Sequence, residues 1–264
     1  QDFSILEEIK TLRIGVLALF AIILISVITI SHNASIKKDG IIEDKTLVFS
    51  DVISGVVSGD EIPEVAEIID AKGGYVSPGL IDLHIHGYLG KDVCDASDDS
   101  IRTMASGIIK NGVTSFLPTT MTVSMDTIKK SLEVIRKLKE ESKTWDGAEI
   151  LGAHAEGPFI SAAKKGAQEE CHILKPDAEF INEYKDVISI ITLAPEEDKD
   201  FSEIRKVSGD VVVSMGHTSA DYETAIQSAQ AGVRHVTHLF NAMTPVMHRA
   251  PGVVIAAMNS DVSC

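Results

Sequence analysis

Alternation of short apolar segments with helical patterns is the feature that most constrains the fold of this chain. Six segments have the apolar, β-branched character of buried strands, and amphipathic stretches separate them. They span residues 80–84, 113–117, 150–154, 187–193, 211–215 and 235–238. Strand–helix alternation is typical of a parallel sheet with crossover helices. The α/β pattern predicts an incomplete (β/α)8 barrel of TIM type rather than a doubly wound sheet.

Two of the separating stretches carry clear helix signals. Ser124 is a candidate N-cap, and Ile128, Leu132 and Ile135 after it form one apolar stripe. Another helix is expected over residues 222–231, and the glycine that follows is a natural C-cap. A Gly-x-Gly-x-x-Gly pattern does not follow the first strand, so dinucleotide binding has no support.

The first of the six strands ends in two histidines. Side chains two apart on a strand point to the same face, so His84 and His86 project together, with Asp82 behind them. Either histidine alone would more often be a satisfied core residue. Burying two imidazoles without a partner is unfavourable, and the pair therefore points to a metal site.

Polar side chains also follow most of the other predicted strands. In a barrel, chemistry takes place where strands end at their carboxyl side. Imidazole and carboxylate groups stand at several of these ends: His84, His86, His154, Glu156, Glu196, His217 and His238. Nitrogen and oxygen ligands without thiolates indicate a catalytic divalent metal, zinc or iron.

Composition excludes some classes of function. The 264 residues hold 24 Lys and Arg against 39 Asp and Glu, a formal net charge of −15. With no basic stripe to follow a phosphate backbone, nucleic-acid binding is not expected. The three cysteines are widely spaced and form no Cys-x-x-Cys pair, which fits a reducing, cytoplasmic setting.

The N-terminal third differs from the rest. Residues 14–30 form an uncharged apolar run near the lower length limit of a membrane helix, so residues 1–32 are predicted as an apolar helical segment. Membrane association and a buried or unrelated segment both remain open. Residues 33–76 read as short strands with turns, the first part of a small β-sandwich domain. Residues 77–264 would then hold the first six strands of the barrel.

Several motifs, in a fixed order, resemble one enzyme family. They are Pro-Gly-Leu-Ile-Asp-Leu-His-Ile-His-Gly at 78–87, Gly-Ala-His-Ala-Glu-Gly-Pro-Phe at 152–159, Lys-Lys-Gly-Ala-Gln at 164–168, Gly-His-Thr at 216–218, Thr-His-Leu-Phe-Asn-Ala-Met at 237–243 and Arg-Ala-Pro-Gly at 249–252. Together they resemble the N-acetylglucosamine-6-phosphate deacetylases of the amidohydrolase superfamily. The apolar N-terminal run has no counterpart in that family.

The resemblance implies a role for each matching residue. Glu156, His217 and His238 fall on the principal metal ligands, and His84 and His86 on the pair that holds a second metal where it is kept. One or two Zn or Fe ions per subunit are therefore expected. From the residues themselves, His154 is a candidate to orient Glu156, with which it shares a strand face.

Further positions match the family's substrate site. They are Gly166, Ala167, Gln168, Asn241, Ala242 and Arg249. Arg249 matches the arginine that reaches the sugar phosphate, which suits a planar guanidinium that can bind two oxygens. No catalytic residue is assigned within the chain, because the family's general-base aspartate is expected beyond Cys264. The fragment by itself is therefore expected to be inactive.

The implied function is metal-dependent removal of the acetyl group from N-acetylglucosamine 6-phosphate by a cytoplasmic homodimer. Two alternatives stay open from the sequence. One is another amidohydrolase, dihydroorotase-like or deaminase-like, which would share the barrel and the His-x-His strand. The other is a non-catalytic sugar-phosphate binder tethered to a membrane through residues 14–30, or an anchored enzyme with a cytoplasmic catalytic domain.

Overall fold

We describe the chain from a computed structural model, which defines residues 28–32, 34–37, 41–50, 52–58, 61, 67–72 and 74–264. The chain divides into two compact units. The smaller comprises Gln1–Ile81 and Gly112–Thr114, and the larger comprises Asp82–Asn111 and Ser115–Cys264.

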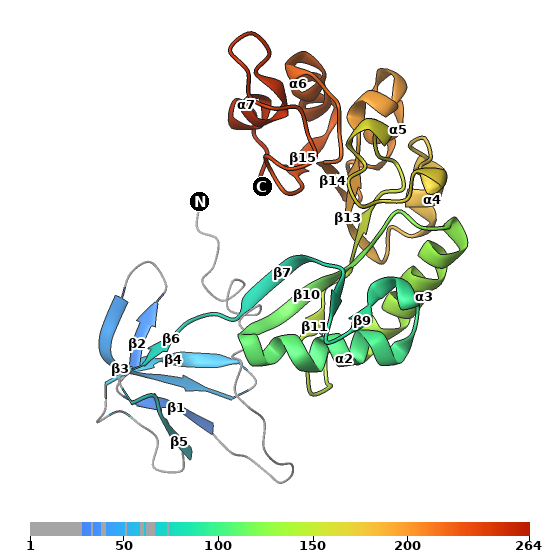
Figure 1. The fold of residues 1–264 in the computed structure, drawn as a ribbon. Coiled ribbons are helices and arrows are strands. Elements are labelled where there is room, and N and C mark those ends of the chain that lie inside the picture. The colour runs from blue at the N-terminus through green and yellow to red at the C-terminus, as the bar shows by residue number, and fades with distance from the viewer. Residues whose placement is uncertain are drawn as a thin grey trace. The chain divides into compact units, whose positions relative to one another are not determined.

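The smaller unit is a six-stranded β-sheet in the described residues (Figure 1). Its strands are β1 (Ile28–His32), β2 (Ala34–Lys37), β3 (Ile41–Phe49), β4 (Ile53–Val57), β5 (Glu67–Asp70) and β6 (Tyr75–Val76). The order is β5-β1-β3-β2-β6, with β4 paired to β3. Leu47 and Val48 are buried at its centre, and Phe49, Ile53, Val57, Ala71 and Val76 pack against them.

The expected apolar N-terminal helix falls largely on residues 1–27, which lie outside the described residues. The end of the apolar run is a strand rather than a helix, because residues 28–30 belong to β1. The β-branched Ile28, Thr29 and Ile30 favour this extended conformation. Among the described residues, no helix combines the length and the apolar character that crossing a membrane requires.

From Leu80 onward the chain alternates strands and helices, and the first two residues of β7 and of β10 belong to the smaller unit. The elements of this part are β7 (Leu80–Ile85), β8 (Gly87–Tyr88), β9 (Lys91–Asp92), α2 (Asp98–Ile108), β10 (Val113–Thr120), α3 (Met125–Glu141), β11 (Glu149–Ile150), β12 (Ala153–Glu156), α4 (Ala178–Glu183), β13 (Ile188–Leu193), α5 (Ser202–Val207), β14 (Val212–Met215), α6 (Tyr222–Ala231), β15 (Val233–Val236) and α7 (Gly252–Met258).

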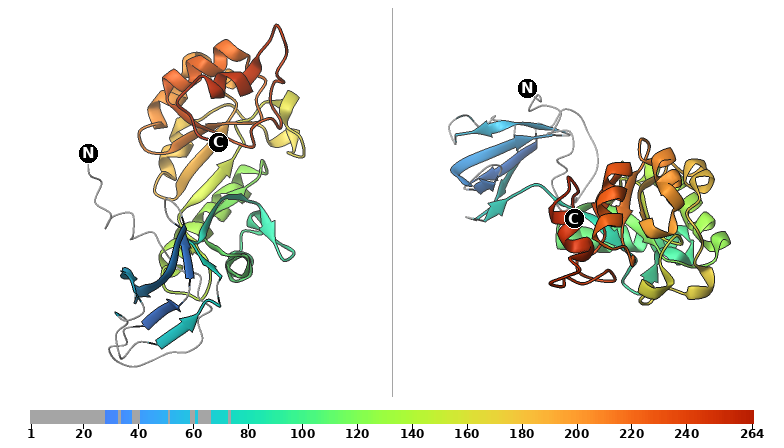
Figure 2. Two further views of the ribbon diagram at one scale, coloured as in Figure 1. Left: turned by 90° about the vertical axis from the view of Figure 1, so that its left-hand side faces the viewer. Right: turned by 90° about the horizontal axis from the view of Figure 1, so that it is seen from above.

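In the described residues, β7 and β10 to β15 form a curled, mostly parallel sheet, an incomplete barrel of TIM type (Figure 1 and Figure 2), and β8 and β9 form a separate two-stranded sheet. The order is β7-β10-β12-β13-β14-β15, and the short β11 also pairs with β10. Each neighbouring pair from β10 to β15 is parallel. The predicted α/β architecture is therefore confirmed. The sixth strand, β15, starts two residues earlier than predicted and ends at Val236, so His238 lies after the strand.

Local signals explain the helix boundaries. The Ser124 hydroxyl accepts a hydrogen bond from the Thr127 N–H and so caps α3, as predicted. The apolar stripe of α3 is buried: Ile128, Leu132, Ile135 and Leu138 are fully covered. Helix α6 ends at Gly232, whose φ of 133° is a conformation that favours glycine.

One expectation about the first strand is wrong. Leu80, Ile81 and Leu83 of β7 are exposed rather than buried. In the described residues β7 pairs with β10 and has no strand on its other side. An edge strand covers fewer of its side chains than a central one.

Candidate metal centre

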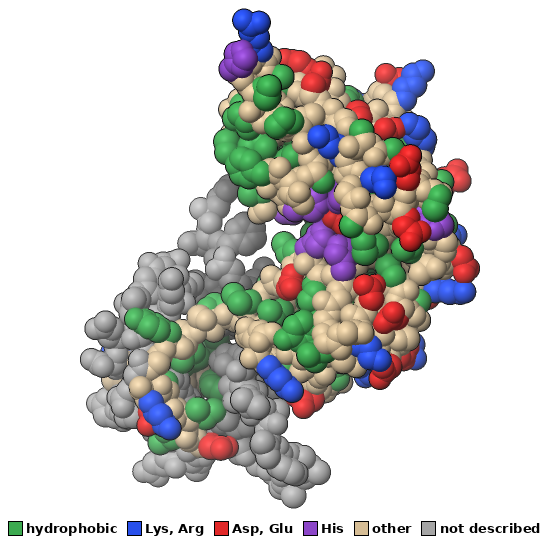
Figure 3. Space-filling view, viewed as in Figure 1, with side chains coloured by type: hydrophobic (Ala, Val, Ile, Leu, Met, Phe, Trp, Pro, Cys, Tyr) green, Lys and Arg blue, Asp and Glu red, His purple; other side chains and the backbone are tan. Residues whose placement is uncertain are grey.

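Four elements deliver histidines and one carboxylate to the same edge of the larger sheet. His84 lies in β7 with His86 just after it, Glu156 is the last residue of β12, and His217 and His238 each follow a strand end by two residues. The carboxyl ends of parallel strands meet at one edge, which is where barrels place their chemistry. In the space-filling view, histidine side chains gather in the middle of the larger unit (Figure 3).

Glu156 lies at the centre of this group and is 2 % exposed. Its Oε1 is 3.3 Å from His217 Nε2, 3.2 Å from His238 Nε2 and 3.5 Å from His84 Nε2. Its Oε2 is 3.2 Å from His86 Nε2. The five predicted metal ligands are thus brought together. They form two groups, Glu156 with His84 and His86, and Glu156 with His217 and His238.

Backbone carbonyls fix the orientation of three of the imidazoles. The Nδ1 atoms of His86, His217 and His238 lie 3.1, 2.8 and 3.0 Å from the carbonyl oxygens of Thr119, Lys164 and Asn241. Because a carbonyl oxygen only accepts hydrogen bonds, each Nδ1 carries the proton. In the neutral ring Nε2 then presents a lone pair to the centre. This arrangement is typical of metal-bound histidine.

Lone pairs therefore converge on a small volume. His217 Nε2 and His238 Nε2 are 3.0 Å apart, and His84 Nε2 and His86 Nε2 are 3.1 Å apart. Glu156 Oε1 is buried and accepts no hydrogen bond. A proton or a metal cation must lie among such acceptors, because an unsatisfied buried carboxylate is unfavourable. The donor set of imidazoles and one carboxylate fits zinc or iron.

Glu156 and the imidazoles around it shift one another's pKa values. Burial alone would lower the pKa of His86 and His238, but the adjacent negative charge of Glu156 raises the pKa of both above the ordinary value. Burial would raise the pKa of Glu156, yet the surrounding histidines, His217 first, hold it well below its usual range. The carboxylate therefore stays ionised and attracts positive charge to the centre.

Two of the predicted metal ligands have a strained backbone conformation that orients their side chains. His217 and His238 have φ values of 46° and 37°, in the left-handed region that residues with a Cβ rarely adopt. Each such residue is unfavourable by about 1–3 kcal/mol and persists only where its surroundings hold it. The chain turns sharply after β14 and after β15, and this turn directs both imidazoles at Glu156.

The loop that follows β12 supports the centre. Gln168 is buried, and its amide Nε2 donates a 2.7 Å hydrogen bond to Glu156 Oε2 while its Oε1 accepts one of 2.7 Å from the Thr122 N–H. Both polar ends of Gln168 are thus used within the protein. Of the two residues before it, Gly166 lies beside the His217 ring and Ala167 is exposed.

The remaining predicted substrate residues lie on the segment after β15. Asn241 and Ala242 take part through their backbone: the Asn241 carbonyl accepts from His238, and the Ala242 carbonyl accepts from the Thr218 N–H. Arg249 is exposed and lines a separate pocket of about 480 Å³ with Tyr222 and Met247. The described residues offer its guanidinium no hydrogen-bond or ionic partner, so its role in binding stays a prediction.

His154 does not orient Glu156 directly, although the two share a strand face. Its Nδ1 lies 2.9 Å from the Leu83 carbonyl and its Nε2 lies 2.6 Å from Thr192 Oγ1. Both ring nitrogens are thereby occupied. Burial lowers the pKa of His154 to about 3, so the imidazole is neutral.

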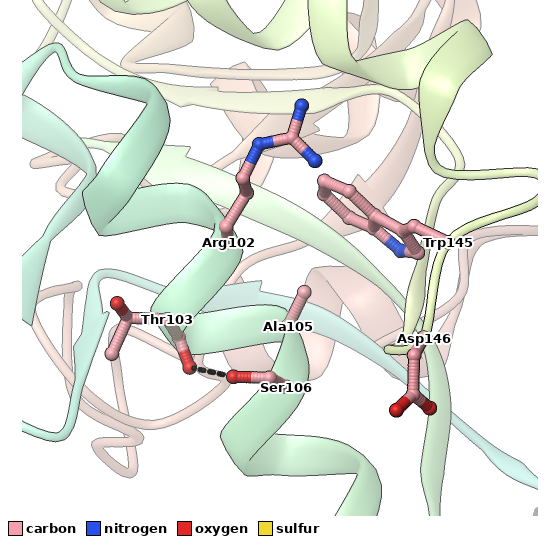
Figure 4. Close-up of a pocket in the computed structure, with 6 residues that line it drawn as sticks. All are labelled: Arg102, Thr103, Ala105, Ser106, Trp145 and Asp146. Carbon is pink, nitrogen blue, oxygen red and sulfur yellow. Dashed lines mark hydrogen bonds between the residues drawn. The ribbon is translucent and has the colours of Figure 1, made fainter. Parts of the chain in front are cut away.

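Two other features of the larger unit lie apart from the centre. Glu169 and Cys171, which are exposed, and the half-buried His172 form a group that shares no residue with it. A pocket of about 280 Å³ is lined by Arg102, Thr103, Ala105, Ser106, Trp145 and Asp146 (Figure 4). The Arg102 guanidinium lies 5.0 Å from the Trp145 ring centroid and forms an ion pair with Glu141. That arginine is therefore already partnered.

Comparison with known proteins places the chain in a family. Residues 75–262 match the model of the amidohydrolase family. The chain is 42% identical over 205 residues to N-acetylglucosamine-6-phosphate deacetylase from Bacillus subtilis, which covers 75% of this chain and 52% of that protein. It is 37% identical over 195 residues to the human protein of the same name, covering 70% of this chain and 47% of that one. The chain thus spans about half the length of these relatives.

Solved structures of proteins with the same name as these relatives are similar to this chain. N-acetylglucosamine-6-phosphate deacetylase from Pasteurella multocida superimposes with a TM-score of 0.82 at 34% identity, over 88% of this chain and 62% of that one. A mutant of the Mycobacterium smegmatis deacetylase, in complex with N-acetyl-D-glucosamine-6-phosphate, gives 0.75 at 26% identity, over 90% and 61%. On the extent of the family match, together with a fold and a cluster of potential ligands that agree with it, this chain belongs to the amidohydrolase family.

Proposed function

We propose that the protein containing this chain is a metal-dependent deacetylase that hydrolyses N-acetylglucosamine 6-phosphate to glucosamine 6-phosphate and acetate. One observation carries the proposal: a buried carboxylate, Glu156, whose Oε1 accepts no hydrogen bond, lies among four imidazole Nε2 atoms. The relatives that bear the name N-acetylglucosamine-6-phosphate deacetylase support the choice of substrate.

Within this proposal each residue has a defined task. Glu156, His217 and His238 would hold the principal metal ion, zinc or iron, and His84 and His86 would hold a second one where it is present. A bound divalent metal supplies a Lewis acid for the amide carbonyl and lowers the pKa of a water molecule to roughly 7. Gln168 keeps Glu156 in place through its 2.7 Å hydrogen bond.

The phosphate group calls for different residues. The exposed guanidinium of Arg249 is free to pair with a dianion in a bidentate manner. Asn241 and Ala242 follow His238 by three and four residues, so their segment would place the sugar phosphate next to the metal centre. Assembly as a homodimer belongs to the same proposal.

Acetate release tests the proposal. A protein of the relatives' full length that contains this chain should release acetate from N-acetylglucosamine 6-phosphate and lose this activity with a chelator. His217→Ala should abolish it, whereas His172→Ala, which removes a half-buried histidine from outside the centre, should leave it unchanged. Full activity in a rigorously metal-free sample would overturn the mechanism, and equal activity on unphosphorylated N-acetylglucosamine would overturn the substrate.

A further inference from the structure

A row of hydrogen-bonded side chains crosses the sheet next to the metal centre. His154 Nε2 lies 2.6 Å from Thr192 Oγ1, which lies 2.7 Å from Thr237 Oγ1, which in turn lies 2.6 Å from Ser214 Oγ. All four residues are 2 % exposed or less. We call these residues, His154, Thr192, Thr237 and Ser214, the polar row.

The row has one direction of donation. The Leu83 carbonyl can only accept, so His154 Nδ1 donates to it and His154 Nε2 is left as an acceptor. The Thr192 hydroxyl must then donate to His154, which leaves Thr192 Oγ1 to accept from Thr237 and Thr237 Oγ1 to accept from Ser214. Each hydroxyl has one proton to give, and every one is committed. A fully satisfied network of this kind admits a single arrangement.

The members of the row stand next to the metal-ligand positions in the sequence. Leu83, whose carbonyl ends the row, precedes His84. His154 lies two residues before Glu156 on the same strand face. Thr237 directly precedes His238, a residue with a strained backbone. The row therefore ties together strands that deliver ligands to both halves of the centre.

Hydroxyl groups at these positions need an explanation other than stability. Thr192 and Ser214 are direct partners in the pairing of β13 with β14 and are fully buried, and replacing both hydrogen-bonded partners by apolar groups of the same shape can be nearly neutral for stability. A Val in place of Thr192 would keep the shape but remove the link between His154 and Thr237. The orientation of the row's neighbours would then no longer be fixed by hydrogen bonds.

We propose that the polar row is a positioning device for the metal centre, with the Thr192 hydroxyl as its central link. The row sets the separation of the His84, Glu156 and His238 side chains by holding the backbone that carries them. This inference rests on the proposed metal-dependent function, because it concerns the geometry of that metal site. None of the four side chains is assigned a contact with substrate.

Cobalt binding by the full chain provides the test. Co²⁺ reports on ligand geometry through its visible absorption spectrum. Thr192→Val should weaken Co²⁺ binding by roughly 10- to 100-fold, the range found when groups that orient metal ligands are removed, and should alter the spectrum. Thr192→Ser keeps the hydroxyl. Its Co²⁺ affinity should therefore stay within a few-fold of that of the original chain, and its spectrum should be the same.

The neighbouring strand offers a matched control. Thr120 of β10 is also fully buried, but its Oγ1 has no hydrogen-bond partner. Thr120→Val removes the same group without breaking the row, so its Co²⁺ affinity and spectrum should equal those of the original chain. An equal loss of Co²⁺ affinity in Thr120→Val and Thr192→Val would show that removing any buried hydroxyl weakens metal binding, and would overturn the proposal.

The other possible results of the cobalt experiment also test the positioning role. An unchanged spectrum and affinity in Thr192→Val would refute the positioning role. If Thr192→Val does not fold by circular dichroism, Ser214→Ala, which removes only the last donor of the row, replaces it. A smaller change in the same direction is expected for Ser214→Ala, and no change would refute the role. Failure of the original chain to bind Co²⁺ would instead refute the metal centre itself, and with it the proposed function.

Discussion

Replacing Gln168 by Leu gives the sharpest perturbation of the candidate metal centre that leaves every ligand in place. Leu has nearly the volume of Gln but neither donates nor accepts a hydrogen bond. The change leaves Glu156 Oε2 and the Thr122 N–H without their 2.7 Å partners in a buried environment. A lost hydrogen bond to a charged group is unfavourable by about 1.5–3 kcal/mol, and an orphaned buried N–H by about 1–3 kcal/mol.

Water entry and relaxation reduce the sum, so Gln168→Leu should lower the free energy of unfolding by about 2–4 kcal/mol. Urea unfolding followed by tryptophan fluorescence measures it, because Trp145 is the chain's one tryptophan and lies in the larger unit. Gln168→His, which keeps a donor, should lose less. Metal affinity should fall as well, since the amide orients the central carboxylate.

The opposite result would be informative. If Gln168→Leu unfolds at the same urea concentration as the original chain and binds metal equally well, Gln168 does not support Glu156. The reading of the loop after β12 as a support of the centre would then be wrong. The match of Gln168 to a substrate-contact position of the family would then explain this residue better.

Three further expectations concern the same unit. Replacing both His84 and His86 by Ala should lower the metal content measured by elemental analysis from about two ions per chain to about one, and complete loss would contradict the ranking of the ligands. Thr120→Val should raise the free energy of unfolding by about 1 kcal/mol, because the hydroxyl it removes is buried without a partner, and a lower urea midpoint would contradict this reading. Chelation should lower the urea midpoint of the original chain, since a ligand that binds only the folded state stabilises it, and an unchanged midpoint would argue against a bound ion.

Much of the fold is readable from the sequence because its signals are local. Apolar β-branched runs specified the strands, and Ser124 and Gly232 marked a helix start and a helix end that the structure has. The exposure of Leu80, Ile81 and Leu83 is not readable in this way. Burial of a strand depends on which strands flank it, and that information lies outside its own residues.

The candidate site, like the fold, could be predicted from the sequence only in part. The residue types at strand ends predicted a metal site at this edge of the sheet, and the family resemblance selected His84, His86, Glu156, His217 and His238 as its ligands. The supporting interactions were missed, because a Gln or Thr in the sequence does not show where its side chain points. Gln168 matched a substrate position, yet its amide is buried against Glu156. Thr192 read as an ordinary strand residue, although its hydroxyl joins two strands.

The central claim is that Glu156 and the surrounding histidines hold a divalent metal. Elemental analysis of the purified chain and of Glu156→Gln, which keeps the shape of the side chain and removes its charge, tests this most directly. We predict one or two zinc or iron ions per chain in the original protein and their loss in Glu156→Gln. Absence of metal from the original protein, or equal metal content in both, would contradict the account.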